Sequence, residues 1–463
     1  MTVHGSRRAC LILGALLCSA GAGLAEAGSL QDRFYGGTAD RPAQRAPVQP
    51  GAGDSPLLAQ AGPGSSGGIP AYGLSDSRLA GGASASSANP AIAAVLNGYY
   101  ADFSRPGELR VPGFALGPDA DAGKPGFQLQ DTDLDVYGNI DPYLYGFLVL
   151  TFSGAGGVSV EEAFIQTTTL PFGLILKAGR YHSSIGYLNV FHRHADDFID
   201  PPLVYQAFLN GQLADDGLTL RWVAPTDVLL ELGTELLNGQ NWPAAGSTSQ
   251  GKGTATQFVK LADDLGESAS YLLGLSHVDS AATDRRSGGN DAASHAHGLS
   301  FTGTNSLNIV SFVYKWSPLG NMKYSNFKFQ AEVFQGDEHG VYTVLDTTGA
   351  PSTTAIDLRG SQGANRSGWY AQAAYKFWER WRVGLRQSEV NSARLKDPAA
   401  AGTDLDSTGP LPSISSAMVE YWPSDFSQFR FQYSNDQTIP GRPTDRFYVQ
   451  YLIALGAHGA HSY

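Results

Sequence analysis

Residues 428–434 are QFRFQYS, in which aromatic residues alternate with polar ones. Residues 369–377 (WYAQAAYKF) and 447–455 (FYVQYLIAL) alternate in a similar way. Successive side chains of a β-strand point to opposite faces, so each segment has one apolar face and one polar or mixed face. The apolar face suits lipid, and the other suits a watery or packed lumen. The pattern predicts an all-β fold, a transmembrane antiparallel β-barrel.

The connections between such segments fall into two classes that alternate along the chain. The short ones are residues 141–142, 170–173, 224–227, 264–267, 317–320, 379–380 and 423–425. The longer, mostly polar ones are about 104–126, 153–157, 184–216, 239–254, 280–305, 337–365, 392–411 and 436–444. Short periplasmic turns opposite long external loops are typical of outer-membrane barrels. Counting strands between them predicts about sixteen within residues 92–463, with both ends periplasmic.

Aromatic residues support the same fold. Five of the seven tryptophans lie beside short turns, where they would form an aromatic girdle at the membrane interface; these are Trp222, Trp316, Trp378, Trp381 and Trp422. The chain ends on Tyr463, and outer-membrane proteins resemble one another in ending on an aromatic residue. The alternative is a soluble β-sandwich with aromatic core filling, which would not gather its tryptophans on one set of turns.

Composition narrows the class of protein. The chain has 56 Gly, 21 Tyr and 22 Phe, only 16% charged residues and no stretch of eighteen consecutive apolar residues, so no transmembrane helix is expected. Its net charge of -12 favours cations over anions. The sequence contains no P-loop, dinucleotide-binding glycine pattern, nucleophile elbow or convincing Ser-His pair. We therefore expect neither an enzyme nor a nucleic-acid partner.

The N-terminal region predicts export. Residues 1–27 have Arg7 and Arg8, then an apolar core and small residues, as in a signal peptide. Cys10 and Cys18 both lie there, so the mature chain would have no disulfide; lipidation at Cys18 is an alternative that the preceding Leu disfavours. Residues 28–91 are rich in Gly, Ala, Ser and Pro, which predicts a disordered periplasmic segment or, alternatively, a partner-binding arm.

One long connection carries unusual chemistry. Residues 188–203 are LNVFHRHADDFIDPPL, with two histidines and three carboxylates close together. Imidazole and carboxylate suit Zn²⁺ or another divalent metal, transported or loosely bound. The candidate ligands are His192, His194, Asp196, Asp197 and Asp200. The two histidines would point the same way on an extended chain and diverge on a helix. The alternative is a constriction loop whose polar groups make structural hydrogen bonds.

The same segment is apolar enough to fold into the barrel mouth or lumen. We expect Phe191, Phe198 and Phe208 to be buried there against the wall. Charged residues on the polar faces of strands are expected to line the lumen; these are Arg221, Glu231, Glu235, Lys328, Glu332, Lys376, Arg382, Arg386 and Arg430. Opposed rows of charge would create a transverse electric field in a pore. The alternative is that the same residues form salt bridges that hold the lumen closed.

The run from Leu188 to Leu203, with Phe208, Leu209 and Gly217, resembles an outer-membrane family labelled zinc-regulated, TonB-dependent receptors. The tail 456–463 (GAHGAHSY) is similar to the family's ending. The resemblance covers about residues 92–463 and implies a porin-like barrel whose production responds to zinc scarcity. TonB-dependent receptors carry a folded plug before a 22-strand barrel, for which this chain is too short. We therefore keep the zinc expectation and not energised transport.

These observations predict a porin-like channel in the outer membrane of a Gram-negative bacterium, passing a small solute such as Zn²⁺, another divalent metal or its complex. The alternative is a surface receptor or structural barrel that binds a partner through external loops. Expected partners are outer-membrane lipid, lipopolysaccharide, the barrel-assembly machinery and the solute; the oligomeric state is left open.

Overall fold

The computed structural model describes residues 90–105, 109–121, 123–154, 156–245, 253–287, 298–345, 349–359, 364–407 and 409–456. The predicted signal peptide (1–27), residues 28–89 of the predicted disordered segment and the tail 457–463 lie outside the described residues.

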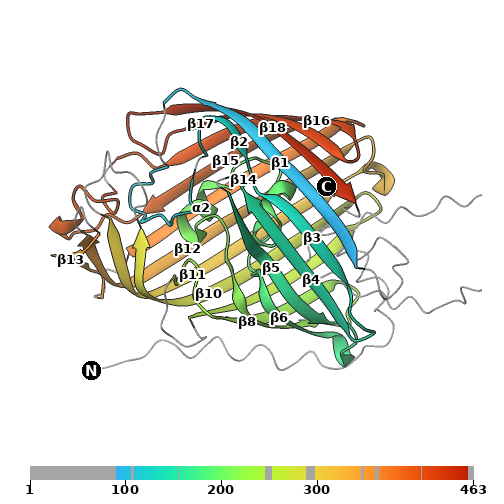
Figure 1. The fold of residues 1–463 in the computed structure, drawn as a ribbon, viewed down its shortest axis with the longest axis horizontal. Helices are drawn as coiled ribbons and strands as arrows, with labels where there is room; N and C mark the ends of the chain where they lie inside the picture. Colours follow the sequence, from blue (N-terminus) through green and yellow to red (C-terminus); the bar gives the residue numbers. More distant parts are fainter. Residues whose placement is uncertain are drawn as a thin grey trace, which may run out of the picture.

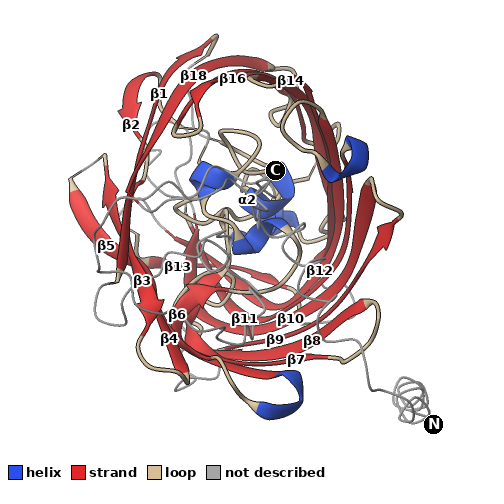
Figure 2. Ribbon diagram, turned by 90° about the vertical axis from the view of Figure 1, so that its right-hand side faces the viewer, coloured by secondary structure: helices blue, strands red, loops and turns tan. Residues whose placement is uncertain are grey.

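The described chain forms one antiparallel sheet that closes on itself (Figures 1 and 2). The last strand, β18, pairs along its length with the first, β1. Two short strands, β2 and β13, pair with β1 and β12, but β1 also pairs directly with β3, and β12 with β14. Removing these two from the 18 strands of the sheet leaves a ring of 18 − 2 = 16. The predicted sixteen-strand barrel is confirmed.

The strands are bounded as follows: β1 Ala91–Phe103, β2 Gly126–Leu129, β3 Thr132–Asn139, β4 Leu144–Ser153, β5 Gly157–Thr167, β6 Leu174–His182, β7 Ala214–Val223, β8 Leu229–Leu237, β9 Thr254–Leu265, β10 Ala269–Ser287, β11 Leu299–Trp316, β12 Asn326–Leu345, β13 Pro351–Asp357, β14 Ala364–Trp378, β15 Trp381–Ser392, β16 Ser413–Ser424, β17 Ser427–Asp436 and β18 Thr444–Gly456. The helical elements are the α-helix α2 (Leu203–Leu209) and the 3₁₀ turns η2 (Pro171–Gly173), η3 (Leu188–Val190), η4 (Arg193–Ala195), η5 (Pro318–Gly320) and η6 (Pro398–Ala400).

The barrel is apolar outside and polar inside. In β17, Phe429 and Phe431 are 42% and 49% exposed, whereas Arg430 and Gln432 between them are buried. Alternation along a strand places the first pair on the outer face and the second in the lumen. A continuous apolar exterior would be unstable in water and is stabilised by lipid, so the protein is an outer-membrane β-barrel. Among the described residues, no helix is long and apolar enough to cross a membrane.

Three expectations from the sequence are corrected. Residues 337–365 were expected to be a loop, but β12 continues to Leu345 and β13 lies within this range. Residues 280–305 were expected to be a loop, but β10 continues to Ser287 and β11 begins at Leu299. These strands have 19 and 18 residues, against about ten needed to cross a bilayer, so the hairpin extends beyond it. Trp422 does not join an outer aromatic girdle. It is buried inside, where the Lys376 ammonium lies 5.1 Å from its ring centroid.

Candidate functional site

The segment between β6 and β7, residues 183–213, enters the barrel interior and is called here the inner loop (Figure 2). His182 and Ala214 are paired across the two strands, so the loop leaves and returns at one point of the wall. It contains η3, η4 and α2, and every residue of α2 is buried. Phe198 and Phe208 are buried and Phe191 is half-buried, so the apolar segment lies inside the barrel, where the sequence predicted it.

A single carboxylate on the wall holds the middle of the inner loop. Glu332 on β12 accepts hydrogen bonds from the Tyr187 backbone N–H at 2.8 Å and the Tyr205 hydroxyl at 2.7 Å, both in the loop. It also accepts from Tyr370 and Ser311 of neighbouring strands, at 2.7 and 2.6 Å. Hydrogen bonds to a buried charge are among the stronger ones in proteins, so these contacts fix the loop's position.

The carboxylates of the loop face a basic part of the wall. Asp197 pairs with Lys328 at 2.7 Å and Arg382 at 2.8 Å, and Asp200 pairs with Arg386 at 2.7 Å. Burial alone would raise the pKa of Asp197, but Lys328 and Arg382 hold it well below its usual range. Both aspartates are therefore ionised anchors of the loop.

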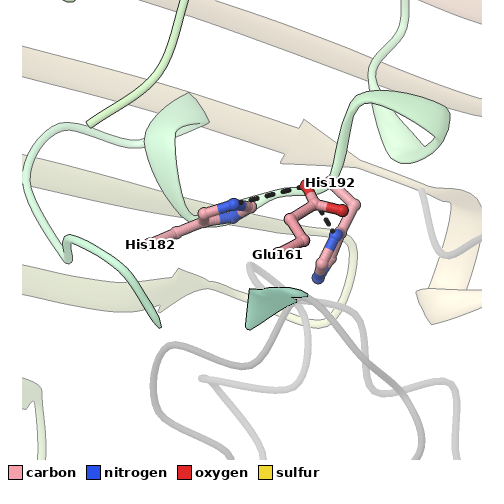
Figure 3. A group of neighbouring side chains, drawn as sticks. All are labelled: Glu161, His182 and His192. Carbon is pink, nitrogen blue, oxygen red and sulfur yellow. Dashed lines mark ion pairs between the residues drawn. The ribbon is translucent and has the colours of Figure 1, made fainter. Parts of the chain in front are cut away.

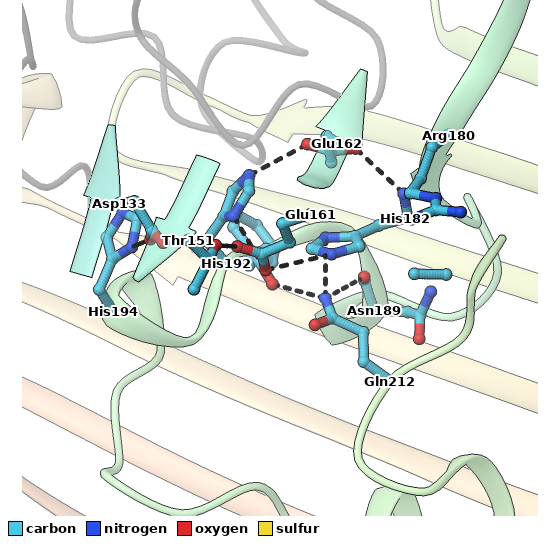
Figure 4. A network of polar contacts seen from close by, with 12 residues as sticks. Asp133, Thr151, Glu161, Glu162, Arg180, His182, Asn189, His192, His194 and Gln212 are labelled. Atoms are coloured by element: carbon cyan, nitrogen blue, oxygen red, sulfur yellow. Dashed lines mark hydrogen bonds and ion pairs between the residues drawn. The ribbon is translucent and has the colours of Figure 1, made fainter. Parts of the chain in front are cut away.

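The histidines of the loop face an acidic part of the wall (Figure 4). His192 Nε2 lies 3.0 Å from Glu162 on β5, and His194 Nδ1 lies 2.9 Å from Asp133 on β3. The two imidazole rings stack with centroids 5.6 Å apart. Burial disfavours the charged form of His192, but Glu161 and Glu162 raise its pKa well above the usual value. The loop thus joins an acidic side of the lumen to a basic side.

A third group lies where the loop begins. Glu161, His182 and His192 bring ligand-type atoms within 4.8 Å of one another (Figure 3). Glu161 and Glu162 are consecutive, so a regular strand would turn one of them towards lipid. The β4–β5 register instead shifts here, from Val149↔Glu162 to Leu150↔Val160. Glu161 is the extra residue of a β-bulge, a feature that often re-aims a side chain next to a functional site.

The metal ligands predicted from sequence do not come together as one group. Among the described residues, the group able to surround an ion includes His192 but not His194, Asp196, Asp197 or Asp200. The reason is charge pairing, because Lys328, Arg382 and Arg386 occupy Asp197 and Asp200, and Asp133 occupies His194. Asp196 is half-buried, and its buried Oδ1 makes no hydrogen bond.

The charged residues predicted to line the lumen do face the interior. Lys328, Glu332, Arg382, Arg386 and Arg430 all contact the inner loop, the last through the Asp196 backbone oxygen at 2.7 Å. Glu235 accepts from Ser183 and Ser184 at the start of the loop. Arg221 lies 3.5 Å from Glu231, and Lys376 lies over Trp422. Most of these groups therefore pair with the inner loop or with one another inside the barrel.

Sequence reasoning missed Glu161, Glu162, His182 and Asp133. The adjacent glutamates in an otherwise alternating strand were the available signal, because one of them has to break the alternation. His182 ends β6 and faces the site only because the inner loop folds back over it. Asp133 is recruited from β3, 61 residues before His194, and local sequence carries no sign of that pairing.

Comparisons with known proteins identify a relative by sequence. An uncharacterized protein of Aquifex aeolicus (strain VF5) is 30% identical over 359 residues, covering 73% of this chain and 71% of that protein. No family model matches the sequence.

Solved structures with a similar fold come from the outer membrane. An anion-selective porin from Comamonas acidovorans is 11% identical with a TM-score of 0.47, over 79% of this chain and 99% of that one. The outer membrane channel DcaP of Acinetobacter baumannii is 12% identical with a TM-score of 0.46, over 79% and 97%. Pseudomonas putida OprB is 10% identical with a TM-score of 0.48, over 79% and 94%.

Proposed function

The chain belongs to the same family as the uncharacterized Aquifex aeolicus protein, and we propose that it is an outer-membrane channel for small solutes, narrowed by its inner loop. The observation that carries the proposal is the inner loop itself, which crosses a polar lumen and is anchored to both an acidic and a basic wall. A sixteen-strand barrel is wide enough to leave an aqueous passage unless its interior is filled. We assign it no catalytic step.

The solute class follows from the acidic side of the lumen. Asp133, Glu161 and Glu162 lie beside three histidines, whereas the loop carboxylates Asp197 and Asp200 are neutralised by basic residues. Carboxylates grouped with imidazoles favour a cation, and a divalent metal such as Zn²⁺ or its complex is our first candidate. The resemblance to zinc-regulated receptors agrees with this choice. Contact with lipid and lipopolysaccharide, and insertion by the barrel-assembly machinery, are part of the proposal.

A second function is favoured by one observation. Arg382, Glu420 and Arg430 form a buried ion-pair network, with Arg–Glu distances of 2.6 and 2.7 Å. Such a network strengthens a filled interior, as a structural barrel or a surface receptor would need if its external loops bind a partner.

Conductance separates the two functions. Purified protein inserted into a planar lipid bilayer in KCl is expected to give discrete conductance steps. The reversal potential across a KCl gradient is expected to show a preference for cations. A flat trace from protein that is folded in the bilayer would contradict the channel and favour the structural or receptor barrel.

A further inference from the structure

We propose that Glu161, His182 and His192 form a divalent-metal site of the zinc type, which ties the start of the inner loop to strands β5 and β6. The site is resident and structural: its ion would clamp the loop. It therefore does not depend on whether the channel conducts, or on which solute passes.

Distances between the three side chains suit an ion better than they suit hydrogen bonds. Glu161 Oε1 lies 3.3 Å from His192 Nδ1 and 3.4 Å from His182 Nε2. His192 Nδ1 is buried and makes no hydrogen bond. Ligand atoms about 2.0–2.1 Å from a tetrahedral Zn²⁺ are about 3.3 Å from one another, which is the spacing of Glu161 from each histidine. The two ring nitrogens lie within 4.8 Å of each other, so binding an ion would draw them closer together.

Surrounding contacts orient the ligands. The Thr151 hydroxyl lies 2.7 Å from Glu161 Oε2 and 2.8 Å from Asp133 Oδ1, and its single hydrogen can bond to either carboxylate. Glu161 Oε2 thus faces Thr151, and Oε1 faces the two rings. Glu162 Oε2 lies 3.0 Å from His192 Nε2 and can accept a hydrogen bond from an Nε2–H group (Figure 4). In that tautomer, Nδ1 has a free lone pair. A carboxylate holding the far nitrogen of a ligating histidine is the usual outer partner in zinc sites.

The far nitrogen of His182 has a weaker restraint. The Gln212 side-chain nitrogen lies 3.0 Å from His182 Nδ1, but also 2.6 and 2.7 Å from the backbone oxygens of Asn189 and Phe191. Those two carbonyls use both amide hydrogens. Gln212 therefore does not fix which nitrogen of the His182 ring carries the proton.

The bulge in β5 is a second, independent observation. Without it, one of the two glutamates would face lipid; with it, Glu162 orients His192 while Glu161 faces both rings. The Glu161 side chain is 23% exposed, against 3% and 2% for His182 and His192, which leaves an approach for an ion and for a water molecule as fourth ligand.

An ion pair alone accounts for less of the geometry. A protonated His192 between Glu161 and Glu162 would explain both contacts of its ring. The contact of His182 Nε2 with the same oxygen of Glu161, at 3.4 Å, would then need a separate, long hydrogen bond. An ion shared by three ligands accounts for both rings.

The test is calorimetric titration of ZnCl₂ into the mature full chain in detergent. We expect wild type to bind one equivalent of Zn²⁺ at this site. The Glu161→Gln, His182→Gln and His192→Gln variants are each expected to lose that equivalent. His194→Gln is the matched control, because this histidine stacks on His192 but pairs with Asp133, and it is expected to keep the equivalent. Glu162→Gln, which loosens only the outer partner, is expected to weaken binding about tenfold.

Two results would overturn the site. One is equal stoichiometry and affinity in wild type and the three ligand variants. The other is loss of the equivalent in His194→Gln but not in His182→Gln. If the variants do not fold, Co²⁺ is added to wild type and its visible absorption is measured. The proposed site predicts the intense absorption of tetrahedral Co²⁺. Weak octahedral bands would contradict it. Absence of metal binding in a protein that conducts would remove the site and leave the channel standing.

Discussion

The hydroxyl of Tyr205 in α2 donates a hydrogen bond of 2.7 Å to Glu332 on β12, a strand well removed around the ring from β6 and β7, where the inner loop begins and ends. The loop is therefore held at its ends by the backbone and at its middle by a buried carboxylate. Two further sets of contacts, to Lys and Arg on one side and to Glu and Asp on the other, complete its attachment.

Removing the central anchor should loosen the loop. In Glu332→Ala, four donors lose their acceptor inside the barrel: the Tyr187 N–H and the hydroxyls of Tyr205, Tyr370 and Ser311. Buried donors left without a partner cost about 1–3 kcal/mol each, so we expect the free energy of unfolding in urea to fall by about 4 kcal/mol or more. Glu267→Ala, in an exposed turn, is the control and should not change the midpoint. An unchanged midpoint in Glu332→Ala would show that the loop is held elsewhere.

Neutralising a loop carboxylate should destabilise the fold and change ion selectivity. Asp197→Asn leaves Lys328 and Arg382 without their shared partner. Breaking a buried ion pair costs about 3–5 kcal/mol, and the lumen gains one positive charge. We expect the reversal potential across a KCl gradient to shift towards anion preference. Asp227→Asn, in an exposed turn, should behave as wild type. A shift towards cations would contradict the charge assignment.

Asp196 should make stability depend on pH in a specific direction. Burial, and then the neighbouring charge of Asp197, raise the pKa of Asp196 to about 8, against the partial opposing effects of Arg193, Lys328 and Arg430. Between about pH 4, its value in the unfolded chain, and about pH 8, the folded protein holds a proton that the unfolded chain has lost. This group's contribution to stability therefore falls as pH rises through that window.

The Asp196→Asn variant isolates this contribution, since asparagine is a neutral isostere. We expect its urea midpoint to equal that of wild type near about pH 4 and to exceed it increasingly towards about pH 8. Using the difference between the two proteins cancels the opposite pH dependence of Asp197 and Asp200, whose pKa values are lowered. A constant difference across this range would show that Asp196 is ionised in the fold.

Much of the barrel could be predicted from the sequence because its signals are local. Residues 428–434 alternate between outer and lumen faces, and the structure has Phe429 outside and Arg430 inside. The short connections were recognisable from proline, glycine and charged residues, as at 317–320. Neither signal limits how far β10 and β11 continue beyond the membrane, so their extra length was missed.

The site could be predicted only in part because it is assembled across the barrel. The histidines and aspartates of the inner loop were visible as a group, but their partners come from β3, β5, β12 and β15. Which loop carboxylate would be neutralised depends on where Lys328 and Arg386 lie around the ring. The position of Glu161 depends on a bulge that one pair of adjacent glutamates only hints at.

If the inner loop narrows a conducting barrel, removing the loop should raise the single-channel conductance. Since His182 and Ala214 are paired across β6 and β7, residues 184–212 can be replaced by a short Gly-Ser turn without moving either strand. Wild type and this variant would be compared in planar bilayers at one salt concentration, with heat-induced unfolding as the check on folding. We expect conductance in both proteins, several-fold larger in the variant. Equal conductance in the two folded proteins would contradict this expectation.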